Sequence, residues 1–405
     1  MSSRTTCLVT LHGIGFEQPP QPELNIPGYA DQLHEHLSKY LGIMLSDDPH
    51  RAHERKQPGQ SGAIYVQSRW LTPAGTASRQ EGLKRLGNWS KDMRRVETEQ
   101  APLVANDSCI SHVALVYSDL EPKEPEVGPA LVTSAMSLLS LSSYAHVAGL
   151  MHMVMTDILA MVRHHTAPSD DRPSSLRPRV AHSSRSHQHL KHQEQVESQQ
   201  PSGLITTLRT LEDDVACYVC HNEEREQVRS FVAEALLRLA FRDDVDAIVL
   251  NTHSNGTVVA LDVIRQLPPF AAAKIKAFIT AGSPLRKYVN LLHWGQQIEC
   301  SRPIPSWYNF WDECDPVADP LEPPITWHRG DKLASPYDPK LFRFIDPNSG
   351  TPSNIEVADI KVDNIHNSTG GGLQAHNYWD NEEQFVKQFA DIVRKLVGKR
   401  LATAA

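Results

Sequence analysis

The chain has 405 residues, of which 40% are hydrophobic and 22% charged, so it can bury a large core in one big domain or two ordinary ones. Its formal net charge of −8 provides no overall basic surface, which argues against a nucleic-acid partner. Six cysteines are too few for a disulfide scaffold, and the first residues lack the long apolar region of a secretory signal. We therefore expect a soluble, cytoplasmic protein.

Several stretches are typical of strands, and some are nearly continuous apolar runs, as expected of strands that are covered on both faces. These stretches are residues 6–11, 63–70, 112–118, 247–252, 275–281 and 306–312. Helical patterns lie between or after them, at 29–42, 204–240, 257–267 and 382–399. This alternation predicts an α/β fold with a parallel sheet and right-handed crossovers, in a single domain over 1–405.

An apolar segment interrupts this rhythm. Residues 128–156 carry no charged side chain, and we predict a helical insertion over 121–165. At about 1.5 Å per residue the uncharged stretch is long enough to cross a hydrocarbon core of about 30 Å. However, its serines and histidines dilute its hydrophobicity, and Asp157 follows directly. We favour a lid or interfacial helix, with peripheral membrane contact through 128–163, over a buried core helix or a membrane span.

A second interruption follows at residues 166–203, which are rich in Ser, Gln, His, Arg and Pro. Such a segment buries too little apolar surface to offset the entropy of ordering, so we predict a disordered linker within the insertion. Its histidines have no scaffold that would fix a metal geometry, and we interpret them as solvated.

A serine stands at an abrupt strand-to-helix junction in "AIVLNTHSNGTVVALDVI", residues 247–264. A turn of this kind projects a hydroxyl above a sheet, at the cost of a strained backbone and small neighbours. Gly256 lets the helix pack closely, and the helix N-terminus favours negative charge beside Ser254. We predict that Ser254 is a nucleophile, and a helix N-cap is the structural alternative.

The turn resembles the nucleophile motif G-x-S-x-G of the α/β-hydrolase fold of serine esterases and lipases, with Thr252 in place of the first glycine. The resemblance covers most of the chain apart from the insertion, and implies a mostly parallel sheet flanked by helices. "TCLVTLHGIGF", residues 6–16, resembles the oxyanion loop of such enzymes. The resemblance implies an oxyanion hole made by the N–H groups of Ile14 and Asn255, while an ordinary strand-to-turn junction is the alternative at His12.

The resemblance also implies the chain order serine, acid, histidine. "WYNFWDECDPVADPL", residues 307–321, offers Asp312, Asp315 and Asp319. Asp315 lies in D-P-V, which is similar to the acid loop of lipase-like hydrolases, so we favour it over the other two. Roles as turn residues or helix caps are the structural alternatives.

His376 in "LQAHNYWDNEEQF" lies in a loop just before the final helix, where the resemblance places the catalytic histidine. His366 and His328 are its rivals. With Ser254, Asp315 and His376 the chain is expected to be a serine hydrolase that cleaves carboxylic (acyl) esters, lipid-like ones in particular, through an acyl-enzyme. The alternative is a catalytically inactive hydrolase-like protein with a binding or scaffolding role, in which Thr252 reflects relaxed demands on the turn.

Two further motifs favour other chemistry at first sight. "CYVCH", residues 217–221, matches the attachment pattern of c-type haem, but Tyr218 and its apolar neighbours have helical spacing, so we favour helix packing over haem or a redox dithiol. Ser283 precedes Pro284 and is interpreted as a helix cap. The sequence has no phosphate-binding glycine loop, no H-E-x-x-H and no clustered carboxylates, so we expect no cofactor and no metal.

Overall fold

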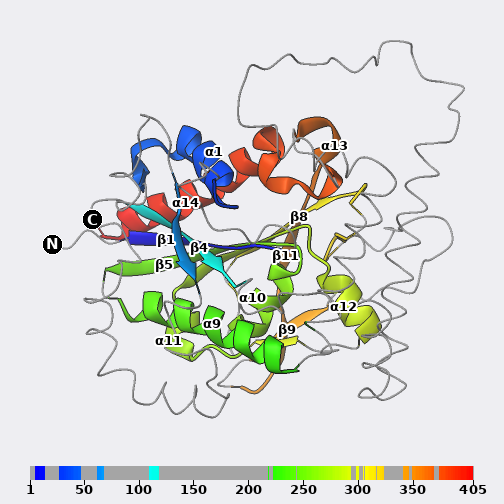
Figure 1. Cartoon of the computed structure of the whole chain (residues 1–405). Coiled ribbons are helices and arrows are strands. Elements are labelled where there is room, and N and C mark those ends of the chain that lie inside the picture. The colour runs from blue at the N-terminus through cyan, green and yellow to red at the C-terminus, as the bar shows by residue number, and fades with distance from the viewer. Residues whose placement is uncertain are drawn as a thin grey trace, which may run out of the picture.

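Figure 1 shows the structure of the chain, which is a computed structural model. The structure describes residues 5–13, 27–46, 62–67, 109–117, 218, 222–242, 244–292, 298–300, 304, 306–315, 317–322, 341–345, 349–368 and 374–404.

The centre of the fold is an eight-stranded sheet with the order β11-β8-β6-β5-β1-β4-β2, in which β3 also pairs with β4. The strands are β1 (Thr5–Leu11), β2 (Leu45–Ser46), β3 (Ile64–Gln67), β4 (Ile110–Val116), β5 (Val245–His253), β6 (Ile275–Ala281), β8 (Trp307–Asp312) and β11 (Val357–Val362). All neighbouring pairs in this sheet are parallel. The carboxyl ends of the strands therefore meet at one edge, and the segments that follow them lie close together there.

Helices cover both faces of the sheet (Figure 1). On one side lie α1 (Asp31–Leu41) and α14 (Lys387–Ala404), and on the other α9 (Asn222–Phe241), α10 (Gly256–Ile264), α11 (Pro269–Ala272) and α12 (Leu285–Leu292). Shorter helical pieces are η2 (Gly42–Met44), α13 (Asn364–Asn367), η4 (Gln374–His376), η5 (Tyr378–Asp380) and the π-helical turn η6 (Glu382–Val386).

The hydrophobic core is divided between the two faces of the sheet. In β5, Ile248 and Leu250 pack with α9 and α10, whereas Val249 between them packs with α1 and α14. Successive side chains of a strand point to opposite faces, so a strand covered on both faces needs apolar residues at every position. This explains the continuous apolar run of β5, and the predicted α/β class with a mostly parallel sheet is confirmed.

A small second sheet has the order β10-β9-β7. It consists of β7 (Ile298–Cys300), β9 (Phe342–Ile345) and β10 (Pro352–Asn354). It joins the main core through the ring of Phe342, whose centroid lies 4.6 Å from that of Trp307 in β8.

Most predicted elements coincide with observed ones within a few residues. The predicted strand at 275–281 is β6, and the helix predicted at 382–399 begins as the π-helical turn η6 and continues as α14. The strands β2, β7, β9, β10 and β11 were not predicted. The predicted helical insertion at 121–165, its stretch 128–163 and the predicted linker at 166–203 lie outside the described residues.

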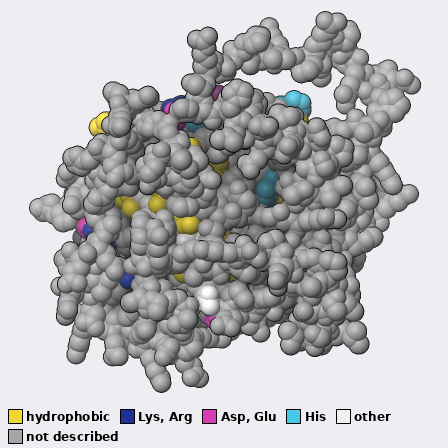
Figure 2. All heavy atoms as spheres, viewed as in Figure 1, with side chains coloured by type: hydrophobic (Ala, Val, Ile, Leu, Met, Phe, Trp, Pro, Cys, Tyr) yellow, Lys and Arg dark blue, Asp and Glu magenta, His cyan; other side chains and the backbone are white. Residues whose placement is uncertain are grey.

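In the space-filling view of the same face, the described side chains reach the surface in small separate patches, and hydrophobic ones lie left of the centre (Figure 2). Among the described helices, none combines the length and the apolar character needed to cross a membrane.

Candidate active site

Ser254 lies in a tight turn directly after β5. Its φ of 52° is in the left-handed region, and it is the one non-glycine residue with positive φ in the described part of the chain. Its N–H donates to the Ala281 carbonyl at 2.9 Å, and its carbonyl accepts from the N–H and the hydroxyl of Thr257 at 3.0 and 2.7 Å. These bonds hold a strained conformation that the turn alone would not keep. Because Asn255, and not Ser254, occupies the N-cap of α10, the structure does not support the capping alternative.

Two glycines allow the end of β1 to approach this turn. A Cβ on Gly13 would overlap the Cβ of Ser254 and lie 3.1 Å from its hydroxyl oxygen, and a Cβ on Gly256 would overlap the carbonyl oxygen of His12. The predicted close packing at Gly256 is therefore confirmed. Gly13 brings the backbone that follows β1 against the serine.

His376 and Asp315 form a buried pair next to the serine turn. Nδ1 of His376 lies 2.8 Å from Oδ2 of Asp315, and the side chains are 9% and 0% exposed. The other carboxylate oxygen of Asp315 accepts from the Val317 N–H at 2.9 Å. Burial by itself would raise the pKa of Asp315, but the His376 ring and these hydrogen bonds together hold it below its ordinary value. An ionised carboxylate can only accept, so Nδ1 of His376 carries a proton and donates it to Asp315.

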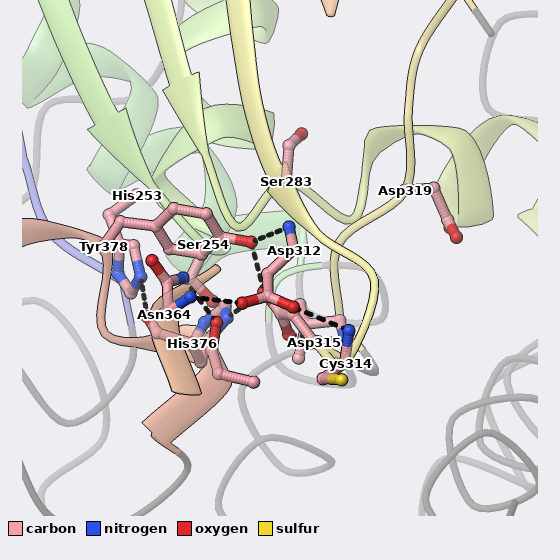
Figure 3. Close-up of polar contacts among 12 residues, drawn as sticks. His253, Ser254, Ser283, Asp312, Cys314, Asp315, Asp319, Asn364, His376 and Tyr378 are labelled. Carbon is pink, nitrogen blue, oxygen red and sulfur yellow. Dashed lines mark hydrogen bonds and ion pairs between the residues drawn. The ribbon is translucent and has the colours of Figure 1, made fainter. Parts of the chain in front are cut away.

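Nε2 of His376 is buried and makes no hydrogen bond with any described residue. The ring lies close to the serine turn, because Ala281, which accepts from Ser254 N–H, precedes Gly282, and Gly282 packs against the ring. Figure 3 shows His376 of η4 grouped with Ser254, which follows β5, and Asp315, which follows β8.

The structure separates the three candidate acids by their contacts. Asp312 accepts from the backbone N–H groups of Cys314 and Asn364, at 2.7 and 2.5 Å. Asp319 forms a buried ion pair with Lys287, with 2.5 Å between Oδ2 and Nζ, and Figure 3 shows it away from the group. Of the three, Asp315 is therefore the one in contact with His376.

The rival histidines differ from His376 in their surroundings. His366 is exposed and contacts Asp363 within α13, with 2.7 Å between Nδ1 and Oδ2. His328 lies outside the described residues.

Two further histidines, His253 and His12, are buried and neutral near the carboxyl ends of the strands. Burial lowers the pKa of His253 to about 3, and the neighbouring His376 adds to the effect. Its Nε2 lies 2.9 Å from the His376 carbonyl oxygen, so Nε2 carries the proton and donates. Burial likewise lowers the pKa of His12 to about 3, and its ring stacks on Tyr117 with 4.0 Å between centroids. Both rings therefore add polar contacts to the site without adding charge.

The structure describes one of the two predicted oxyanion donors. Asn255 stands at the N-terminus of α10, where backbone N–H groups have no acceptor within the helix. Its side-chain oxygen accepts from the Tyr288 hydroxyl at 2.9 Å, which fixes the residue. Ile14 lies outside the described residues, although its neighbour Gly13 is against Ser254.

Three residues of the site were missed from the sequence. Tyr378 donates to Oδ2 of Asp315 at 2.8 Å, the oxygen that His376 also contacts. Asn364 donates from its side-chain amide to the Ala375 carbonyl at 2.6 Å, directly before His376. Gly282, with φ of 63°, packs against the His376 ring. An aromatic residue two positions after His376 and a glycine after β6 are the sequence signals, and neither is specific.

The other highlighted residues have structural surroundings. The hydroxyl of Ser283 accepts from the Leu285 N–H at 3.3 Å at the start of α12, as expected of a helix cap. Tyr218 is buried and donates to Asp262 at 3.0 Å, while Cys217, Cys220 and His221 lie outside the described residues. The described residues contain no group of three or more His, Cys, Asp or Glu that could hold a metal ion.

Comparison of the chain with protein-family models, with curated proteins and with solved structures found no match. The site is therefore interpreted from its own geometry.

Proposed function

We propose that the chain is a serine hydrolase of carboxylic esters with an α/β-hydrolase-like fold, in which Ser254, His376 and Asp315 form the catalytic triad. One observation carries the proposal. A buried histidine, held by a buried carboxylate through Nδ1, has an Nε2 with no hydrogen-bond partner among the described residues, beside a serine in a strained strand-to-helix turn. This combination is what nucleophilic catalysis by serine requires.

In the proposed reaction, Nε2 of His376 takes the proton of the Ser254 hydroxyl while Oγ bonds to the acyl carbon. Asp315 stabilises the imidazolium that forms. The carbonyl oxygen becomes an oxyanion, and the N–H groups of Asn255 and Ile14 are its proposed donors. The imidazolium then protonates the leaving alkoxide, and water releases the acyl group by the same relay. Hydrogen bonds between serine and histidine are often long without substrate, so the lack of one here is compatible with this role.

Thr252 is the residue at which the turn departs from the hydrolase motif. Its side chain is buried, and its hydroxyl donates to the Ile279 carbonyl of β6 at 3.0 Å. The larger residue is thus accommodated by a hydrogen bond to the neighbouring strand. This supports a functional turn over a catalytically inactive scaffold with relaxed demands.

We further propose that the substrates are lipid-like, on the ground of the apolar stretch 128–163 in the sequence. Flotation with phosphatidylcholine vesicles tests this. The full chain should float, and deletion of 130–160 should reduce flotation and raise the relative activity on short soluble esters. Full-length protein that stays at the bottom and prefers acetyl esters would contradict the proposal.

Labelling with a fluorophosphonate probe tests the catalytic role. The wild type should gain one phosphonyl group, and peptide mapping should place it on Ser254. Ser254→Ala should abolish labelling without loss of the fold. Ser283→Ala is the matched control, because it removes another buried serine hydroxyl and should still label. A wild type that does not label, or a Ser254→Ala variant that labels, would overturn the proposal.

A further inference from the structure

Tyr378 connects two carboxylate-bearing segments of the site. Its side chain is fully buried, and its hydroxyl oxygen lies 2.9 Å from the backbone nitrogen of Asp312 and 2.8 Å from Oδ2 of Asp315. The Asp312 N–H can only donate, so the hydroxyl accepts from it. The single hydroxyl proton must then point at Asp315.

The ring of Tyr378 is fixed from several sides. It makes an edge contact with Phe385 at 6.4 Å between centroids and another with His376 at 6.2 Å. On a third side, a Cβ on Gly282 would lie 3.0 Å from its Cε2. The hydroxyl thus has a set position, and its proton does not have to be oriented when the site works.

We infer that Tyr378 is a positioning residue for catalysis, which holds the Asp315 carboxylate in line with His376 and shares its negative charge. The inference rests on the proposed function. Oδ2 of Asp315 receives two donors, His376 and Tyr378, and Oδ1 receives the Val317 N–H. With three donors fixed on three sides, the carboxylate cannot rotate away from the imidazole.

The hydroxyl also affects protonation. The Tyr378 hydroxyl, as a donor to the carboxylate, is one of the contacts that lower the pKa of Asp315 against the effect of burial. Without the hydroxyl, the pKa of Asp315 rises. A protonated Asp315 cannot stabilise the imidazolium that forms when His376 accepts the Ser254 proton, so the loss of reactivity on the acid side moves to higher pH.

Tyr378→Phe in the full chain tests this inference, because it removes one oxygen and keeps the ring. The second-order rate of fluorophosphonate labelling should fall roughly tenfold at neutral pH. The pH at which the labelling rate falls to half on the acid side should rise by about one unit. Tyr218→Phe is the matched control, since Tyr218 is also buried and donates to a carboxylate, that of Asp262, away from the site. It should keep both the rate and the pH profile of the wild type.

A double variant separates positioning from general stabilisation. In an Asp315→Asn background, Tyr378→Phe should cause little further loss, because its partner is already altered. An equal tenfold loss in both backgrounds, or a Tyr378→Phe profile identical to that of the wild type, would overturn the role of Tyr378 while leaving the proposed function intact. A wild type that never labels would overturn both.

Discussion

Gly282 packs so closely against the imidazole of His376 that a Cβ on the glycine would be 2.6 Å from Cε1 and 2.9 Å from Nδ1 of the ring. Its φ of 63° also belongs to the left-handed region. The site therefore requires a glycine here for two independent reasons, the backbone conformation and the space that the ring occupies.

Gly282→Ala should displace His376 and slow fluorophosphonate labelling by at least tenfold. Because alanine disfavours a positive φ, the substitution should also lower the unfolding free energy by about 1–2 kcal/mol. Gly350→Ala is the matched control, since Gly350 has φ of 66° and no described atom within 4 Å of its Cβ position. It should lose similar stability and keep its labelling rate. Equal labelling of the two variants would show that the contact with His376 is unimportant.

Replacing each of the three candidate aspartates with asparagine should identify the acid of the proposed triad. Asp315→Asn should lower the labelling rate by roughly 10³–10⁴. Asp319→Asn should instead lower the unfolding free energy by about 3–5 kcal/mol, because it leaves the buried Lys287 without its carboxylate partner. A larger loss of labelling in Asp319→Asn or Asp312→Asn than in Asp315→Asn would assign the acid differently.

Asp312 should make the stability of the protein pH-dependent. Burial raises the pKa of its carboxyl to about 6, above its value in the unfolded chain. Between about pH 4 and 6 the folded state therefore binds more protons than the unfolded state at this group, and its contribution to stability falls as pH rises. The unfolding free energy of the wild type minus that of Asp312→Asn should decrease from pH 4 to 6 and then level off. Urea denaturation across this range measures it, and a difference that increases with pH would contradict the assignment.

Asn364 should act on the loop that carries His376. Asn364→Ala removes the donor to the Ala375 carbonyl and the acceptor for the Asn381 amide, so we expect a loss of about 1–3 kcal/mol and slower labelling. Asn367→Ala in the same helix removes one bond, to the Asp363 carbonyl, and should leave labelling unchanged. Normal labelling by a folded Asn364→Ala variant would indicate that the loop holds its position by other contacts.

The central strands were predictable because both of their faces are buried. β5 and β6 show this as continuous apolar runs. β11 lies at the edge of the sheet and contains the partly exposed Asp359 and the exposed Lys361, so its sequence carries no comparable apolar signal. Local patterns thus predicted the inner strands and missed β11 and β2, which end the strand order.

The residues of the candidate site likewise divide into those that a local sequence pattern predicted and those that it missed. Ser254 and Gly256 lie in one local turn, and a local pattern was enough to predict their relationship. Tyr378 matters through the carboxylate of Asp315, a contact across 63 positions in the chain. The importance of Gly282 likewise depends on a ring that comes from a distant loop. Such contacts exist only once the sheet has brought the segments together.

The strand order has one more consequence. β1 and β5 are neighbours, but the strands that follow β1, namely β2, β3 and β4, lie on one side of this pair, whereas those that follow β5, namely β6, β8 and β11, lie on the other. In open parallel sheets, such a topological switch point leaves a crevice at the carboxyl ends, because the two connections diverge. Gly13 and Ser254 stand at this point. The strand order, before any side chain is considered, thus puts the serine at the position where open parallel sheets generally bind their ligands.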